Sequence, residues 1–290
     1  LGDLDQLLEI LERTRVRLDV RRPGEAEEHV QLRTRVLLDI ARTREKLGQE
    51  PDDVLEAYTE AVAAPGHGAD AEEGLEQLAR AMGRLDLFVH VLLDLPPQVA
   101  TLERLAAALE ELQDFSRLVR VRTQLAQLAE GELERADRTH DLGRALEQVG
   151  QLDDAMARYA QVLEQVPLHR PALHGLQRLY RERGGMEQAL AALLEQELQV
   201  VEDAGRRFDV LFELAGCRDE LGQLEAAAAL LERCLELRPD SLEVLLWLER
   251  LYDPDRPIEL ARTVARRARQ VEDDRERASR VTAELDALGH

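Results

Sequence analysis

Residues 142–167 read LGRALEQVGQLDDAMARYAQVLEQVP, and residues 214–239 read LAGCRDELGQLEAAAALLERCLELRP. The two stretches are related by a shift of 72 residues and are identical at nine of 26 positions. The same shift carries Tyr180 onto Tyr252. Self-similarity at a fixed period is typical of a protein built from stacked repeats, so the sequence predicts a repeat architecture.

The repeated stretch has the pattern of two helices joined by a short turn. Apolar residues recur at helical spacing, as in Leu142, Ala145, Leu146 and Val149. Glycine and proline interrupt this pattern and leave helical segments of roughly 12–18 residues. Strand signals are weak, because β-branched runs are few and no Asn-Gly hairpin turn occurs. The sequence therefore predicts an all-α fold.

The spacing of the turn glycines narrows the kind of repeat. Gly150 and Gly184 are 34 residues apart, and Gly184 and Gly222 are 38 apart. A helical hairpin of this length, with a turn glycine and a closing proline, resembles the tetratricopeptide repeat. The hairpin that matches best carries the pattern at Leu142, Gly143, Leu146, Gly150, Ala155, Tyr159 and Pro167. The resemblance implies an all-α, right-handed α-solenoid of antiparallel helix hairpins, with about seven repeats and a terminal helix.

The repeats differ along the chain. The hairpin over 97–130 lacks a turn glycine, and the start of the chain matches only the second helix of a repeat, which suggests a fragment of a longer array. The expected segments are a truncated repeat at 1–20, repeats at 26–96 with an irregular short repeat at 69–95, repeats at 97–271, and a capping helix at 272–290.

The composition limits the classes of partner. The chain has 38 basic and 59 acidic residues and a formal net charge of −21. Such a surface repels phosphate, so nucleic acid is not an expected partner. No uncharged stretch approaches the length of a membrane span, so membrane insertion is not expected either. The two cysteines and the lack of a signal peptide favour a reducing, cytoplasmic location. Lys46 is the only lysine and asparagine is absent, a bias typical of GC-rich bacterial genomes.

We find no pattern of residues typical of an enzyme, a metal site or a cofactor site. The sequence contains neither a zinc-protease motif nor a phosphate-binding glycine loop. His169 and His174 are separated by a proline, so one helical face does not present both. Cys217 and Cys234 are interpreted as small core residues, with a redox pair as the alternative. Trp247 is either a filler between repeats or a surface anchor for a partner.

The resemblance also implies a binding groove. In tetratricopeptide repeats, defined positions of the first helix face a concave groove, and the chain carries several basic residues at these positions. An arginine-lined ledge suits an acidic segment, whereas the alternative is that these arginines pair with glutamates one helical turn away. The lysine and asparagine of the carboxylate clamp found in chaperone-binding relatives are missing. The expected groove residues are His140, Arg144, His174, Arg178, Arg181, Phe212 and Arg250.

These features predict a non-catalytic scaffold for protein–protein interaction. The expected partner is a peptide, a helix or a small globular protein, bound most favourably in the groove. The alternative is a regulatory or sensor segment of a larger enzyme or signalling protein. A monomer is favoured over self-association.

Overall fold

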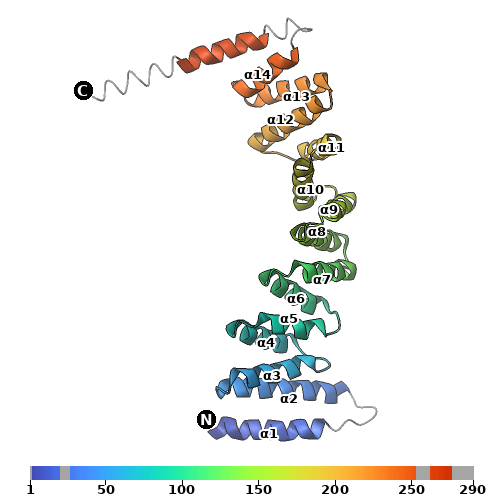
Figure 1. Cartoon of the computed structure of the whole chain (residues 1–290), viewed down its shortest axis with the longest axis vertical. Coiled ribbons are helices and arrows are strands. Elements are labelled where there is room, and N and C mark those ends of the chain that lie inside the picture. The colour runs from blue at the N-terminus through green and yellow to red at the C-terminus, as the bar shows by residue number, and fades with distance from the viewer. Residues whose placement is uncertain (1, 20–26, 253–261, 276–290) are drawn as a thin grey trace, which may run out of the picture. The chain divides into compact units, whose positions relative to one another are not determined.

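The computed structural model describes residues 2–19, 27–252 and 262–275, and every regular element in these ranges is an α-helix (Figure 1). Residues 262–275 form a helix after α14. The preceding helices are α1 (Gly2–Leu18), α2 (Glu27–Lys46), α3 (Pro51–Ala63), α4 (Ala69–Ala81), α5 (Leu85–Leu93), α6 (Val99–Glu111), α7 (Phe115–Leu128), α8 (Glu132–Gln148), α9 (Leu152–Gln165), α10 (Arg170–Arg183), α11 (Glu187–Leu198), α12 (Ala204–Glu220), α13 (Leu224–Leu237) and α14 (Leu242–Tyr252).

The helices pair into hairpins that follow one another along the chain (Figure 1). From α2 to α12, the first helix of each hairpin is even-numbered and the second helix follows after a short turn, and α14 holds the first-helix place of the next repeat. Helices pack mainly on their neighbours in sequence, and α4 also packs on α6. The predicted all-α stack of helix hairpins is confirmed.

The chain divides into two compact units, Leu1–Arg158 and Tyr159–His290. This division falls within α9, whereas the sequence pattern places a segment boundary at 96/97. The described part of the C-terminal helix already begins at Arg262, ahead of the expected start at 272, and residues 276–290 lie outside the described residues. The irregular repeat at 69–95 consists of the 13-residue α4 and the nine-residue α5.

Most first helices end in a left-handed turn. Gly150 has φ 76°, and its backbone N–H donates to the Glu147 carbonyl over 2.9 Å. Gln113 has φ 56° and makes the equivalent bond to Glu110 over 3.1 Å. The hairpin without a turn glycine therefore keeps the same helix end, although a side chain disfavours this backbone conformation.

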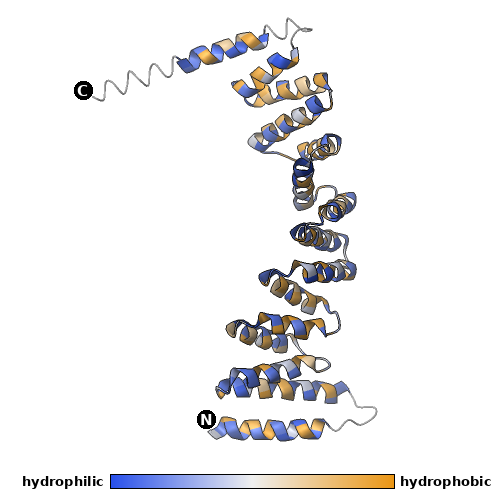
Figure 2. Ribbon diagram, viewed as in Figure 1, coloured by the Kyte–Doolittle hydropathy of each residue, from blue (hydrophilic) through white to orange (hydrophobic). Residues whose placement is uncertain are grey.

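Large aromatic side chains fill the space between hairpins. Tyr58 and Tyr159 are buried, and each lies against a glycine of the next first helix. A Cβ atom on Gly74 would lie 2.3 Å from Tyr58 Cε1, and one on Gly175 would lie 2.9 Å from Tyr159 Cε2. These glycines are required by close packing. Hydrophobic and hydrophilic residues are interleaved along the helices (Figure 2), as expected for helices that bury one face.

Candidate protein-binding surface

We call the surface formed by the first helices of each unit the first-helix face. It comprises α2, α4, α6 and α8 in unit 1 and α10, α12 and α14 in unit 2. The residues predicted for the groove all lie on these helices.

Arginine–carboxylate pairs join neighbouring first helices on this face. In unit 1, Arg42 of α2 lies 2.9 Å from Asp70 of α4, and Arg138 of α8 lies 3.2 Å from Glu103 of α6. In unit 2, Arg250 of α14 pairs with Asp219 of α12. The partners are about one repeat apart in sequence, so these pairs tie each repeat to the next. Each exposed pair contributes about 0–1 kcal/mol.

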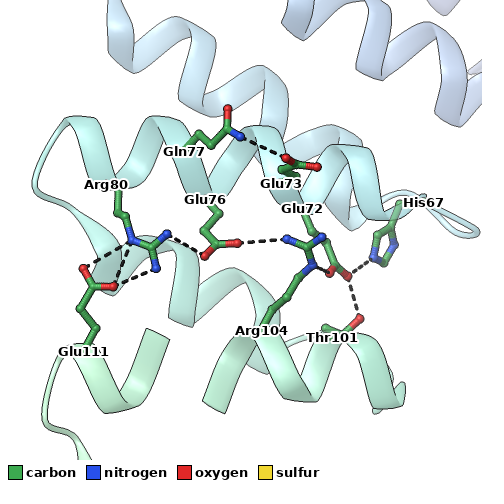
Figure 3. A network of polar contacts seen from close by, with 9 residues as sticks. All are labelled: His67, Glu72, Glu73, Glu76, Gln77, Arg80, Thr101, Arg104 and Glu111. Carbon is green, nitrogen blue, oxygen red and sulfur yellow. Dashed lines mark hydrogen bonds and ion pairs between the residues drawn. The ribbon is translucent and has the colours of Figure 1, made fainter. Parts of the chain in front are cut away.

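The densest network of this kind joins α4 to α6 (Figure 3). Glu72 is 3% exposed and receives a hydrogen bond of 2.7 Å from Thr101 Oγ1. His67 Nε2 lies 2.9 Å from the same carboxylate oxygen, and Arg104 Nε lies 3.5 Å from the other one. Buried charges need such partners, so Glu72 fixes how the two helices meet.

The network continues along both helices to their C-terminal ends (Figure 3). Arg104 Nη1 lies 3.1 Å from Glu76, and Arg80 Nη1 lies 3.0 Å from the same residue. Arg80 also donates to both oxygens of Glu111. The charged side chains of this part of unit 1 are thus paired with one another.

The first-helix face of unit 2 contains a hollow with a volume of about 520 Å³. It is lined by the end of α10, the start of α11, the middle of α12 and one residue of α14. This volume is in the range of sites that hold ligand side chains. Its apolar lining residues are Tyr180, Met186, Leu190, Phe212 and Trp247.

Aromatic contacts build one wall of this hollow. The rings of Phe212 and Trp247 meet edge to face with centroids 5.1 Å apart, and Phe208 stacks on Phe212 at 6.0 Å. Trp247 Nε1 donates a hydrogen bond of 2.9 Å to Asp219, which fixes the indole ring. The guanidinium of Arg250 lies 5.7 Å from the centre of the same ring. The wall is therefore both apolar and held in place.

The charged residues of the hollow are mostly acidic. Arg181 is committed to Glu213, to which its Nη2 donates over 2.8 Å. Glu187 and Glu220 add two further negative charges to the lining. Burial, followed by the charges of Glu213, Glu220 and Glu187, raises the pKa of the Cys217 thiol to about 11. Burial likewise raises the pKa of Tyr180. The hollow is therefore a site that disfavours added negative charge.

The structure places the predicted groove residues in different surroundings. Arg181 and Phe212 line the unit 2 hollow, and Arg250 supports its tryptophan wall. His174 lies 3.6 Å from the buried Glu197 in a separate hollow of about 460 Å³. Arg178 lies 3.4 Å from Glu182, one turn along its own helix.

His140 and Arg144 lie in unit 1. His140 Nδ1 is 3.6 Å from Asp141, and Arg144 lines a hollow of about 270 Å³ with that aspartate. Burial opposes ionisation of Asp141, but His140, Arg122 and Arg144 together lower its pKa. A ledge that joins these residues to those of α10 stays a prediction.

The predicted groove arginines differ in their partners. Some pair within their own helix and others pair with a neighbouring repeat. Arg178 pairs one helical turn away, as the alternative anticipated. Arg181 and Arg250 instead pair with carboxylates of an adjacent repeat. The spacing of residues within one helix does not predict these pairs. Sequence reasoning also missed Tyr180 and Gly216 as lining residues. A glycine inside a helix, as at Gly216, is the one signal that was available for them.

The cysteines and His169, which were considered for redox or metal sites, lie in the core or in a helix cap. Cys217 and Cys234 are free, buried and in different core clusters. His169 precedes α10, where its Nδ1 accepts a hydrogen bond of 3.2 Å from the Ala172 N–H. Among the described residues we find no group of histidine, cysteine and acidic side chains suited to a metal ion. In those same ranges, no helix is both long and apolar enough to cross a membrane.

Comparison with known proteins identifies the repeat. The family model of the tetratricopeptide repeat matches residues 209–241, which run through α12 and α13. The chain therefore contains a tetratricopeptide repeat. This repeat protein is also 34% identical over 106 residues to Protein CTR9 homolog of Arabidopsis thaliana. The match covers 37% of the chain but only 9% of that relative.

The chain also resembles solved structures of low sequence identity. The structure of Naa15/Naa10 bound to HypK-THB is 16% identical, with a TM-score of 0.52 over 87% of the repeat protein and 41% of the other chain. MamA from Desulfovibrio magneticus RS-1 is 15% identical over 61% of this chain and 96% of its own, with a TM-score of 0.40. The first of these supports the helical-repeat fold.

Proposed function

We propose that this tetratricopeptide-repeat protein is a non-catalytic scaffold that holds a segment of another protein on its first-helix face. The hollow of about 520 Å³ in unit 2 carries this proposal. Side chains of three consecutive first helices line it. They include the partly exposed rings of Phe212 and Trp247, and aromatic residues of this kind often dominate protein interfaces. Stacked repeats present such surfaces to extended or helical ligands.

The composition supports a protein partner in a cytoplasmic setting. A formal net charge of −21 opposes binding to nucleic acid or to anionic lipid. The charged network of α4 and α6 in unit 1 already satisfies its own side chains, whereas the unit 2 hollow offers apolar surface. We therefore place the partner in unit 2.

A peptide-display selection tests this proposal. A random-peptide library is panned on the whole chain, and the selected peptides are then measured against two single variants. Gly216→Arg places a long side chain in the hollow, and Ala229→Arg places one on the exposed side of α13. We expect the selected peptides to lose binding to the first variant and to keep it with the second. Equal binding to both variants would show that the partner surface lies elsewhere.

A further inference from the structure

The unit 2 hollow has a counterpart in unit 1 at the same place in the repeat. The hollow of about 270 Å³ is lined by Asp141, Arg144, Ala145 and Gln148. The 72-residue shift carries these positions onto Glu213, Gly216, Cys217 and Glu220, which all line the unit 2 hollow. The two equivalent sites thus differ in only a few side chains.

Gly216 is the difference that opens the site. An added Cβ atom there would meet only Trp247, at an ordinary contact distance of 3.5 Å. Gly74 and Gly175, by contrast, leave no room for a Cβ atom because tyrosine rings pack on them. A glycine inside a helix costs roughly 1 kcal/mol relative to alanine, and packing does not demand one at 216. The equivalent position in unit 1 is Arg144, which lines the smaller hollow there.

Charge is the second difference. In the unit 2 hollow, the guanidinium of Arg181 is already bonded to Glu213. The carboxylate of Glu220 is exposed and has no cationic partner among the residues that the structure describes. Glu187 accepts a hydrogen bond of 2.9 Å from the Gly185 N–H but pairs with no cation in those residues. One basic and three acidic side chains leave the lining negatively charged.

We propose that the unit 2 hollow recognises a basic, leucine-type segment of a partner protein, with an aliphatic side chain seated over Gly216 against Phe212 and Trp247 and a flanking lysine or arginine beside Glu220. This inference rests on the proposed function and specifies the chemistry of its ligand. The aliphatic group gains contact with two ordered aromatic rings. The flanking cation neutralises carboxylates that otherwise lack one, which increases both specificity and the rate of association.

Trp247 is the only tryptophan of the chain, so its fluorescence reports on ligand binding in the hollow. Three synthetic peptides share the core X-Leu-X-X-Leu-X in a Gly-Ser frame, where X is lysine, glutamine or glutamate. Each is titrated into the whole chain at low salt while the emission of Trp247 is followed. We expect the lysine peptide to bind about tenfold or more tightly than the glutamate peptide, with the glutamine peptide between them.

Two pairs of variants locate the effect. Gly216→Arg abolishes the emission change, whereas Ala229→Arg retains it. Glu220→Gln reduces the preference for the lysine peptide, whereas Glu236→Gln, on the exposed surface of α13, changes the net charge equally and leaves the preference intact. Circular dichroism establishes that each variant keeps its helix content.

Several results would overturn the inference. These are equal or tighter binding of the glutamate peptide, an unchanged preference in Glu220→Gln, or no emission change with any of the three peptides. The proposed function is judged separately by the display selection. Selected peptides that are blocked by Gly216→Arg but carry no basic residue would contradict the ligand chemistry and leave the scaffold function in place.

Discussion

Gln113 and Gly150 hold equivalent places at the ends of α6 and α8. Both have positive φ and both donate a backbone hydrogen bond into the last turn of the preceding helix. Glycine adopts this conformation at little steric cost, whereas the Cβ atom of glutamine crowds the adjacent carbonyl. The hairpin at 97–130 keeps the turn because its helices pack on each other and on their neighbours.

We expect Gln113→Gly to raise the free energy of unfolding by about 1 kcal/mol, because the left-handed backbone is then unstrained. The reciprocal change, Gly150→Gln, should lower it by a similar amount. Thermal and urea unfolding of both variants checks the pair. Destabilisation by Gln113→Gly would mean that the glutamine side chain contributes more than its backbone strain costs.

The two cysteines are expected to be unreactive in the folded chain. Burial is the first cause that raises the pKa of each thiol, from 9.0 to about 11. A shift of about two pKa units reduces the thiolate fraction roughly a hundredfold near neutral pH, and the thiolate is the reactive form. At pH 8, a thiol-specific disulfide reagent should modify the native chain at least about a hundredfold more slowly than the chain in guanidinium chloride. Rapid labelling of either thiol in the native chain would contradict its burial.

The same pKa shifts predict how stability depends on alkaline pH. Each folded-state pKa lies above the unfolded value, so folding favours the protonated thiol. The stabilisation is fully present below about pH 9 and is lost as the pH rises through about 11. Replacing both cysteines with alanine should make the stability decline less steeply across this interval.

At the scale of the helices, the contact between α4 and α6 depends on one buried carboxylate. Glu72 accepts from Thr101, and His67 and Arg104 lie close to its oxygens (Figure 3). The neighbouring Glu73 is exposed and accepts a bond of 3.1 Å from Gln77 on its own helix. Two adjacent glutamates therefore have very different structural roles.

We expect Glu72→Ala to lower the free energy of unfolding by about 2–3 kcal/mol, because buried partners lose a charged acceptor. Glu73→Ala, an identical change one residue away, should stay within about 0.5 kcal/mol. Urea unfolding of the two variants makes the comparison. Similar effects of both changes would show that the network in Figure 3 adds little to stability.

At the scale of the whole molecule, stability is distributed along the stack. Helices pack mainly on their sequence neighbours, and arginine–carboxylate pairs join consecutive first helices. Such a chain behaves as a row of repeats coupled to their nearest neighbours. Its net charge of −21 also makes two copies repel each other.

We expect the chain to be monomeric, because this repulsion opposes association of like-charged copies. Size-exclusion chromatography with light scattering, run at two concentrations, measures the mass directly. A mass of one chain at both concentrations is the expected result. A mass that increases with concentration would support self-association instead.

The sequence by itself determined the fold class and the positions of the hairpins. Local chemistry controls both features: helical spacing of apolar residues sets the helices, and Gly150 or Gly222 ends a first helix through its own backbone freedom. These signals lie within a few residues of one another, so no distant contact is needed to read them. The exception, Gln113, shows packing overriding a local preference.

Only the tertiary structure decided which side chains meet across repeats. Arg181 pairs with Glu213, Trp247 pairs with Asp219, and both contacts join residues about one repeat apart. Their formation depends on the rotation and spacing of stacked helices, which the sequence of either helix does not encode alone. The same is true of the unit 2 hollow: Gly216 is visible in the sequence as a glycine inside a helix, but the space that it leaves exists only once α10, α12 and α14 are packed together.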